Sequence, residues 1–422
     1  MYRRLGFAAM PLESPLHSNA RNPVLNTLES RTPESVLALQ ETVQQLSQDR
    51  KPFAPIGSGS KFCWGQSIRT ESLTLLQLTK LNHLVDHAVG DLTVTVQAGM
   101  KFSELQSKLT QAGQCLAIDP GYSDQATIGG IIATGDSGAL RHRYNSVRDM
   151  VLGIEFIRAD GAIAKAGGRV VKNVAGYDLM KLMTGSYGSL GILTQVTLRL
   201  YPLQESSQTV FLTGDSAKLS QLMRSILNSG LTPMAIDLFS STVSTQLNLG
   251  SQMGLLIRFQ GLAESVQEQV RRVIEAGQNQ GLDMQSIGNT EADLWQQLGQ
   301  LFTPPETAET QVLCKWAVRS TETADLLTQL QQICPTAIAR FHGGSGLGQL
   351  RWTGEALPTV DELRQWRSIV ESRGGFLTLL EAPDSIKNSI DVWGYRGNGQ
   401  AWMRSIQQQF DPIGLLSPGR LT

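Results

Sequence analysis

The distribution of glycine is the feature that most constrains how this chain can fold. Of its 41 glycines, 13 fall between Gly121 and Gly191, a window of 71 residues in which an even spread would give about seven. Glycine at this density lets the backbone come close to another strand or to a ligand. Strand-like patterns interrupt the window, so it is not a low-complexity segment. We therefore expect the backbone to contact something in this region.

Charge and composition exclude several classes of protein. The 422 residues are 41% hydrophobic and 17% charged, which suits two or three globular domains. Lys plus Arg number 36 and Asp plus Glu number 37, giving a net charge of −1. A nucleic-acid binder that relies on phosphate contacts, or a polybasic membrane anchor, would be more basic.

The cysteines and the hydropathy pattern exclude others. Cys63, Cys115, Cys314 and Cys334 lie far apart, without the local spacing of a zinc ribbon or an iron–sulfur cluster. A disulfide framework is not expected at this cysteine density. No stretch approaches the roughly 20 apolar residues that cross a bilayer. We expect a soluble cytoplasmic protein, peripheral to a membrane only through partners.

The first half of the chain predicts an α+β fold with short strands. Thr32-Pro33-Glu34 is typical of a helix start, with a hydroxyl N-cap and proline at the first helical position. A second helix is expected from Phe102, closed by Gly113. Alternating or apolar runs predict strands over residues 73–78, 92–98, 151–158 and 192–200.

From about Ser206 the pattern changes to repeated strand–helix units with longer helices. Strand patterns near residues 208–212, 254–259 and 312–318 are each followed by an amphipathic helix, near 219–227, 266–276 and 326–333. This predicts a second α+β domain with an antiparallel sheet covered by helices. We expect domains over 1–205 and 206–395, with 396–422 docking back on the first.

The first candidate site is the loop Pro55-Ile56-Gly57-Ser58-Gly59-Ser60-Lys61. Successive backbone N–H groups and small hydroxyls in such a loop form an anion nest. The spacing fits neither a Walker A loop nor a dinucleotide fingerprint. Taken alone, the loop is as compatible with a plain surface turn as with an anion-binding site.

Three further small-residue segments follow. Asp119-Pro120-Gly121-Tyr122 leads into turns at 127–130 and 133–138, separated by Ile131-Ile132. The others are residues 171–179 and 185–192. A single phosphate group needs only one such loop. Four loops therefore suit a longer ligand that has a pyrophosphate, a ribose and a flat ring.

With these motifs the sequence resembles the FAD-binding family of vanillyl-alcohol-oxidase (PCMH) type, and within it the glycolate oxidase (glycolate dehydrogenase) FAD-binding E subunits. The resemblance rests on the Gly57–Lys61 loop, Ala98-Gly99, the Thr127–Gly138 stretch, Tyr144, Arg148-Asp149, Val151–Gly153, Lys172–Leu179, Gly185–Ile192, Asp411-Pro412 and Pro418-Gly419-Arg420. Residues 206–395 match only loosely. The resemblance implies a two-part PCMH-type FAD-binding domain followed by the second α+β domain.

The resemblance also implies the residues that bind FAD. The Gly57–Lys61 loop would hold the pyrophosphate, and Ile192 would lie on the adenine side. The expected FAD ligands are Pro55, Ile56, Gly57, Ser58, Gly59, Ser60, Lys61, Pro120, Gly121, Thr127, Ile128, Gly129, Gly130, Thr134, Ser137, Gly138 and Ile192.

We expect the FAD to be non-covalent. Relatives that tether the flavin use a His or Cys close to the ring, and residues 55–62 contain neither. His142 is the histidine nearest to the second glycine cluster, and Cys63 is more simply explained as a small packed side chain.

Other polar residues have simpler interpretations. His83 and His87 have the spacing of helical zinc ligands, but they precede a strand and no third ligand is evident, so we expect surface histidines and no metal. The basic cluster Arg141, His142, Arg143 and Arg148 fits either a carboxylate or partner contact or a solvated face.

The catalytic residues are the least defined. Oxidising a 2-hydroxy acid needs an arginine for the carboxylate and a base for the hydroxyl proton. His342, in Phe341-His342-Gly343-Gly344-Ser345-Gly346, resembles part of a motif of the catalytic D subunit but lacks its Asp and second His. His342, Arg319 and Arg351 are the candidates, with Arg340 and Glu381 also available.

Together these features predict an FAD-binding subunit of a glycolate oxidase complex that passes electrons from a 2-hydroxy acid through flavin to partners. A second flavoprotein subunit and an iron–sulfur subunit are the expected partners, since the cysteines of this chain are not clustered. Two alternatives stay open: an autonomous FAD-dependent lactate or glycolate dehydrogenase, and a scaffold with the fold but no redox role. Ser417 and Gln407, where relatives usually carry Asn and Lys, keep the scaffold alternative open, but they lie in the tail and not in the FAD loops.

Overall fold

The computed structural model describes residues 27–68, 70, 72–168, 177–303, 311–352, 354–395 and 397–421. They form two compact units. The glycine-rich unit holds residues 27–138, 145–203 and 395–421, and the large-sheet unit holds Ala139–Tyr144 and Gln204–Gly394. A short segment of the first half of the chain therefore belongs to the large-sheet unit.

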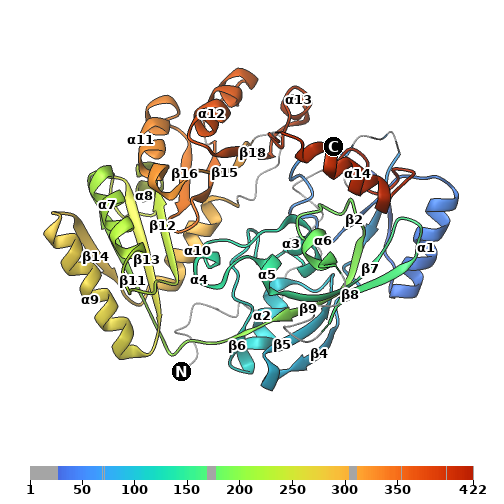
Figure 1. Ribbon diagram of the computed structural model, residues 1–422, viewed down its shortest axis with the longest axis horizontal. Helices are drawn as coiled ribbons and strands as arrows, with labels where there is room; N and C mark the ends of the chain where they lie inside the picture. The colour runs from blue at the N-terminus through green and yellow to red at the C-terminus, as the bar shows by residue number, and fades with distance from the viewer. Residues whose placement is uncertain are drawn as a thin grey trace. The chain divides into compact units, whose positions relative to one another are not determined.

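The glycine-rich unit contains two main sheets (Figure 1). A parallel sheet has the order β1-β3-β2, and an antiparallel sheet has the order β4-β5-β9-β7-β8. Two short strands, β6 and β10, form a third pairing. The strands are β1 Glu29–Arg31, β2 Phe53–Ile56, β3 Thr74–Gln77, β4 Leu84–Ala88, β5 Thr93–Gln97, β6 Gln114–Cys115, β7 Val151–Ile157, β8 Ile163–Gly167, β9 Ile192–Arg199 and β10 Tyr201–Pro202.

The helices of the glycine-rich unit are short except for three. They are α1 Val36–Gln48, α2 Phe102–Gln111, α3 Ile128–Thr134, α5 Val147–Met150, α6 Leu179–Met183 and α14 Gly399–Phe410, with a 3₁₀ turn at Val89–Asp91. Helix α1 buries Leu39, Val43 and Leu46 in a core that also holds Phe53 of β2 and Leu416. The C-terminal segment joins this core, because Ser417 N–H donates to the Phe53 carbonyl over 2.8 Å.

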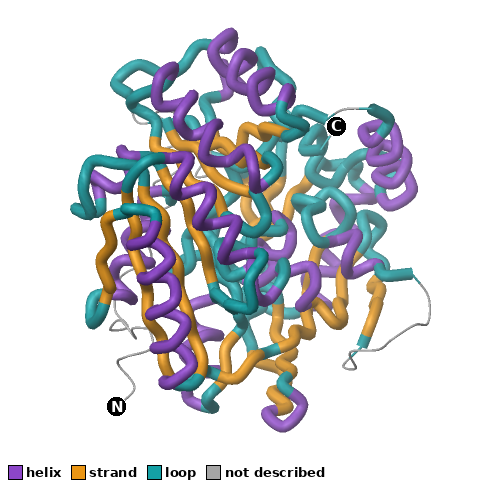
Figure 2. The backbone as a smooth tube through the Cα atoms, turned by 60° about the vertical axis from the view of Figure 1, so that its left-hand side comes forward, coloured by secondary structure: helices purple, strands orange, loops and turns teal. Residues whose placement is uncertain are grey.

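The large-sheet unit is an antiparallel sheet of eight strands in the order β14-β11-β13-β12-β16-β17-β15-β18. Figure 2 shows helices running along these strands. The strands are β11 Ser206–Thr213, β12 Ala235–Phe239, β13 Gly254–Gly261, β14 Asp283–Ile287, β15 Leu313–Ala317, β16 Ile338–His342, β17 Leu347–Arg351 and β18 Phe376–Glu381. The helices are α4 Arg141–Tyr144, α7 Ser216–Leu227, α8 Ser241–Gln246, α9 Ala263–Asn279, α10 Glu291–Leu301, α11 Thr323–Ile333, α12 Val360–Ser372 and α13 Asp384–Lys387, with a 3₁₀ turn at Ser320–Glu322.

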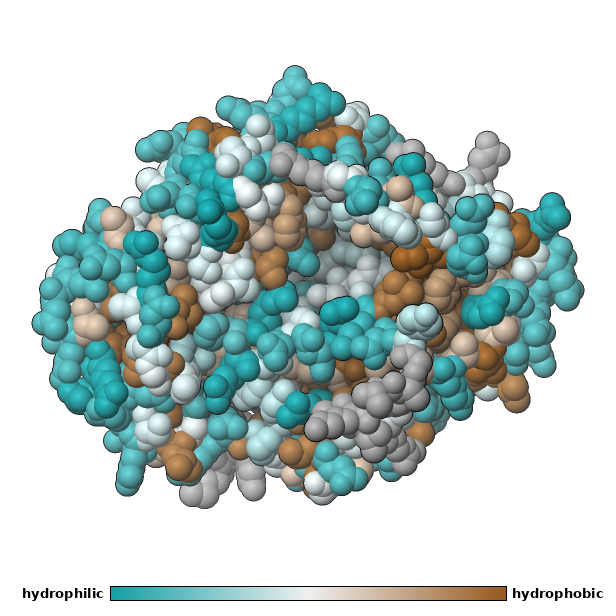
Figure 3. Space-filling model, in the orientation of Figure 1, coloured by the Kyte–Doolittle hydropathy of each residue, from teal (hydrophilic) through white to brown (hydrophobic). Residues whose placement is uncertain are grey.

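Helix α9 shows why these helices cover the sheet. Val266, Val270 and Val273 recur at helical spacing and are buried, while Glu268 and Arg271 are exposed and pair with each other. Hydrophilic residues accordingly dominate the surface over α9, at the left of Figure 3. The predicted α+β class, with an antiparallel sheet covered by helices, is confirmed.

Two local predictions were wrong. The helix expected from Thr32 begins at Val36, because Ser35 Oγ accepts from Ala38 N–H over 3.1 Å and is the N-cap. Of the two turns predicted at 127–130 and 133–138, residues Ile128–Thr134 instead form helix α3, capped by Thr127. Tertiary contacts override the low helix propensity of its two glycines. Of the predicted loop 171–179, residues 171–176 lie outside the described residues.

No helix of the described part of the chain combines the length and hydropathy needed to cross a membrane.

Candidate functional site: a glycine-walled pocket

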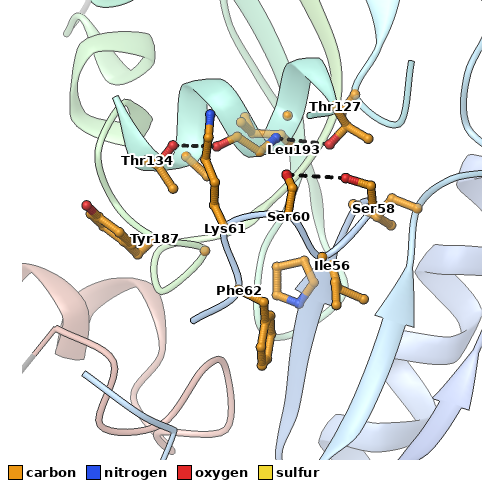
Figure 4. A pocket seen from close by; sticks show the side chains of 18 of the residues that line it. Ile56, Ser58, Ser60, Lys61, Phe62, Thr127, Thr134, Tyr187 and Leu193 are labelled. Carbon is orange, nitrogen blue, oxygen red and sulfur yellow. Dashed lines mark hydrogen bonds between the residues drawn. The ribbon is translucent and has the colours of Figure 1, made fainter. Parts of the chain in front are cut away.

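A pocket in the glycine-rich unit brings together the loop after β2, helix α3 and the loop before β9 (Figure 4). It encloses about 870 Å³ of empty space, part of it open to solvent. The predicted site residues that line it are Pro55, Ile56, Gly57, Ser58, Gly59, Ser60, Lys61, Thr127, Gly129, Gly130 and Thr134.

At the start of α3, glycines allow the backbone segments to touch. A side chain at Gly57 would overlap Thr127, whose Oγ1 accepts from Gly130 N–H over 3.3 Å. Gly129 N–H donates to the Ala98 carbonyl over 2.7 Å. The glycine loop is therefore packed directly against the first turn of α3. Ser58 and Ser60 hydroxyls lie 3.4 Å apart at this end.

At the other end of α3 lies a buried ion pair. Lys61 Nζ is 2.7 Å from Asp136 Oδ2, with the two side chains 4% and 14% exposed. Gly121 N–H donates to the same Asp136 oxygen over 2.8 Å and fixes the carboxylate. Burial lowers the pKa of Lys61, and the Asp136 charge opposes that shift.

Aromatic side chains flank this charged end. Lys61 Nζ is 5.3 Å from the centroid of the Trp64 ring. Tyr187 joins the same region, since its N–H donates to the Ala133 carbonyl over 2.8 Å. Burial is the main reason that the pKa of the Tyr187 phenol is raised, so the phenol stays protonated.

The C-terminal segment completes the wall. Arg420 Nη1 donates to the carbonyls of Trp64 and Gln66, over 3.1 and 2.8 Å, and its guanidinium lies 4.9 Å from the Phe62 ring centroid. Ser417 Oγ donates to the Gly188 carbonyl over 3.0 Å. The residue that differs from the usual Asn therefore still ties the tail to the pocket.

Six predicted ligands do not line the pocket. Ser137 Oγ accepts from Val147 N–H, and a side chain at Gly138 would overlap Asp119. Ile128 and Ile192 are core residues. The remaining two are Pro120 and Gly121.

Further residues line the pocket that were not among the predicted ligands, and those outside the motifs carry no loop signal in their local sequence. The further lining residues are Phe62, Trp64, Leu78, Ala98, Ala126, Ala133, Ser186, Tyr187, Gly188, Gly191, Leu193, Ser417 and Arg420. The motifs at 185–192 and 418–420 were the signal that pointed to some of them.

The histidine pair near β4 makes side-chain hydrogen bonds. His83 Nδ1 lies 2.9 Å from Gln97 Oε1, and His87 Nε2 lies 2.9 Å from Gln114 Oε1. Within the described ranges, no group of three or more His, Cys, Asp or Glu side chains is arranged to hold a metal ion.

The catalytic candidates lie in the large-sheet unit. His342 ends β16 and is buried, with Nδ1 2.7 Å from Oδ1 of the fully buried Asp237 on β12. Arg340 Nη1 is 3.8 Å from the other Asp237 oxygen. His142 of α4 packs against Gly344 of the β16–β17 hairpin, and burial lowers its pKa.

The two candidate arginines differ in setting. Arg319 is largely exposed and lies 3.8 Å from Glu322. Arg351 ends β17, and its Nη1 donates to the Leu301 carbonyl over 2.9 Å.

Residues 30–167 match the family model described as an FAD binding domain. The chain is 29% identical to the glycolate oxidase subunit GlcE of Escherichia coli (strain K12), over 91% of this chain and 96% of that protein. It is 26% identical to the glycolate oxidase subunit GlcD of Bacillus subtilis (strain 168), covering 92% and 89%.

Among solved structures, p-cresol methylhydroxylase with substrate bound has the same fold, with a TM-score of 0.73, 14% identity and coverage of 93% of this chain and 88% of that one.

The pocket residues fit an FAD molecule on their own chemistry. The glycine loop offers backbone N–H groups and hydroxyls, and the far end offers a buried ammonium and aromatic walls. The family match shows an FAD binding domain over residues 30–167, and the chain is an FAD-dependent oxidoreductase similar to glycolate oxidase subunits over most of its length.

Proposed function

We propose that this chain is the FAD-binding subunit of a glycolate oxidase-type complex that oxidises a 2-hydroxy acid, such as glycolate to glyoxylate. The observation that carries the proposal is the similarity to a glycolate oxidase subunit across both units of the chain, 91% of its length. A domain match alone would support flavin binding only.

The residues have distinct parts in this proposal. When bound, FAD supplies the acceptor for the hydride from the carbon that bears the hydroxyl. The loop Gly57–Lys61, helix α3 and Arg420 bind and orient the cofactor. His342 is the candidate for taking the hydroxyl proton, because Asp237 holds its Nδ1 and fixes the ring. Arg319 and Arg351 are the candidates for the substrate carboxylate.

We further propose that the FAD is held without a covalent bond. The side chains that line the pocket, within the described part of the chain, include neither histidine nor cysteine. Acid precipitation of the purified holoprotein should leave the flavin absorbance in the supernatant. Flavin that stays in the pellet after washing would overturn this.

Electrons leave this chain through partners in the proposed complex, a second flavoprotein subunit and an iron–sulfur subunit. The names of the relatives, which are subunits of glycolate oxidase, support a multi-subunit assembly.

The test is a visible absorption spectrum of the purified chain under anaerobic conditions. We expect flavin bands that persist with glycolate alone and bleach when the partner subunits are added. A colourless protein that takes up no added FAD would overturn the proposal and support the scaffold alternative. Added partners that change nothing would sink the proposal.

The second candidate is an autonomous FAD-dependent 2-hydroxy-acid dehydrogenase. The relatives that favour it include the D-lactate dehydrogenase of Anaerostipes hadrus, 27% identical over 79% of this chain. Bleaching by glycolate or D-lactate without any partner would select this candidate.

A further inference from the structure

The buried lysine of the pocket is better placed for the ring of the cofactor than for its phosphates. We propose that Lys61 is a positioning residue that sets a fixed positive charge beside the flavin ring, and that Asp136 holds it there. The proposal rests on the pocket being the FAD site, as proposed above.

Helix α3 separates two chemically different ends of the pocket. Its seven residues, Ile128–Thr134, span about 10 Å. Thr127 at its start touches the Gly57 loop, whereas Tyr187 bonds to Ala133 near its end. In Figure 4, Ser58 and Thr127 lie on one side of the view, and Thr134 and Tyr187 lie on the other.

Lys61 belongs to the second end although it follows the glycine loop in sequence. Its ammonium is 2.7 Å from Asp136, which lies two residues beyond the last residue of α3. Trp64 covers it at 5.3 Å. The sequence places Lys61 in the loop expected to bind the pyrophosphate. In the structure its ammonium instead lies at the opposite end of α3.

The ammonium also keeps bonding capacity for a ligand. The ammonium carries three N–H donors, and its 2.7 Å contact with Asp136 Oδ2 accounts for one of them. Because a buried N–H group without an acceptor is unfavourable, a ligand acceptor placed here would bind more tightly.

Charge decides which part of FAD meets Lys61. The Asp136 carboxylate at 2.7 Å would repel a pyrophosphate at this end. The Gly57–Ser60 loop instead offers uncharged N–H and hydroxyl donors, which suit phosphate oxygens. Aromatic side chains of Trp64 and Tyr187 suit a flat ring.

Removing the charge of Lys61 and removing the charge of Asp136 should shift the midpoint potential of the flavin in opposite directions. Two-electron reduction places negative charge on the ring, so a nearby cation favours the reduced form. Lys61→Met should bind reduced FAD about tenfold less tightly relative to oxidised FAD, a fall of about 30 mV in midpoint potential. Asp136→Asn should raise the potential, and the new amide oxygen still accepts from Gly121 N–H.

The experiment measures midpoint potentials of the holoproteins by dye equilibration, and binding of ADP and of riboflavin to the apoproteins. We expect opposite shifts for the two variants, wild-type potential for Lys61→Arg, and unchanged ADP binding in Lys61→Met. Lys108→Met on the exposed face of α2 is the matched control.

An unchanged potential in Lys61→Met, or a tenfold loss of ADP binding, would overturn the assignment. If Lys61→Met fails to retain FAD, the opposite shift in Asp136→Asn still tests it. A wild-type chain that binds no FAD would instead be a failure of the proposed function.

Discussion

Gly57 is the residue at which the pocket tolerates least change. A methyl group there would overlap Thr127, which caps α3 and is itself buried. Gly57→Ala must therefore push the loop away from the helix. We expect purified Gly57→Ala to carry at least tenfold less flavin per chain, measured from the ratio of visible to ultraviolet absorbance.

The matched control is Gly90→Ala, since nothing lies within 4 Å of a side chain at that exposed position. It should keep its flavin. Circular dichroism should show both variants folded. Full flavin content in Gly57→Ala would contradict the close packing of loop and helix.

His142 connects pH to the stability of the large-sheet unit. Burial lowers its pKa, while the nearby Asp237 opposes the shift and Arg143 and His342 add to it. The folded state therefore binds fewer protons at this site than the unfolded state below about pH 6.5, so the free energy of unfolding falls as the pH decreases.

His142→Gln removes that contribution. The variant should lose less stability than wild type on going from about pH 7 to pH 5, measured by urea unfolding with tryptophan fluorescence. His83→Gln, at an exposed position just before β4, should follow the wild-type curve. Identical pH dependence of wild type and His142→Gln would show that burial does not perturb this histidine.

At the scale of elements, helix α1 begins at a different residue from the one that the sequence pattern predicts. Thr32-Pro33-Glu34 has the composition of a helix start, but Ser35 makes the capping hydrogen bond. The three core residues of α1, Leu39, Val43 and Leu46, fix its register.

Ser35→Ala should destabilise the glycine-rich unit by about 1 kcal/mol because the Ala38 N–H at the start of α1 loses its acceptor. Thr32→Ala should change the free energy of unfolding by no more than a few tenths of that. Urea titrations of both variants measure this. If Thr32→Ala lowered the free energy of unfolding more than Ser35→Ala does, Thr32 would be the N-cap, as the sequence pattern predicts.

For helix α3, the sequence pattern predicted the right location but the wrong secondary structure. Its glycines predicted turns, and the small residues were correctly placed beside the pocket, but the segment is helical. Gly129 is needed because Ala98 lies against it, not because the backbone turns there. A sequence pattern reports that glycine is required and leaves open which neighbour requires it.

At the scale of the whole molecule, burial sorts the four cysteines. Cys115, Cys314 and Cys334 are buried, and burial raises the pKa of each thiol to about 12. Cys63 is partly exposed. At pH 8 we expect one thiol per native chain to react with a disulfide reagent in minutes, and four after unfolding.

Cys63→Ser should remove the fast reaction and leave the slow ones. Rapid modification of two or more thiols in the native wild-type chain would mean that one of the units opens readily.

The sequence by itself determined the α+β class, the small-residue segments that line the pocket and the strand–helix repeats, because these depend on local periodicity and on glycine content. Only the tertiary structure decided that Lys61 faces Asp136, that Asp237 holds His342, and that Arg420 reaches Trp64. These partners are 75, 105 and 356 positions apart. Such contacts arise from strand order and core packing, which no local pattern encodes.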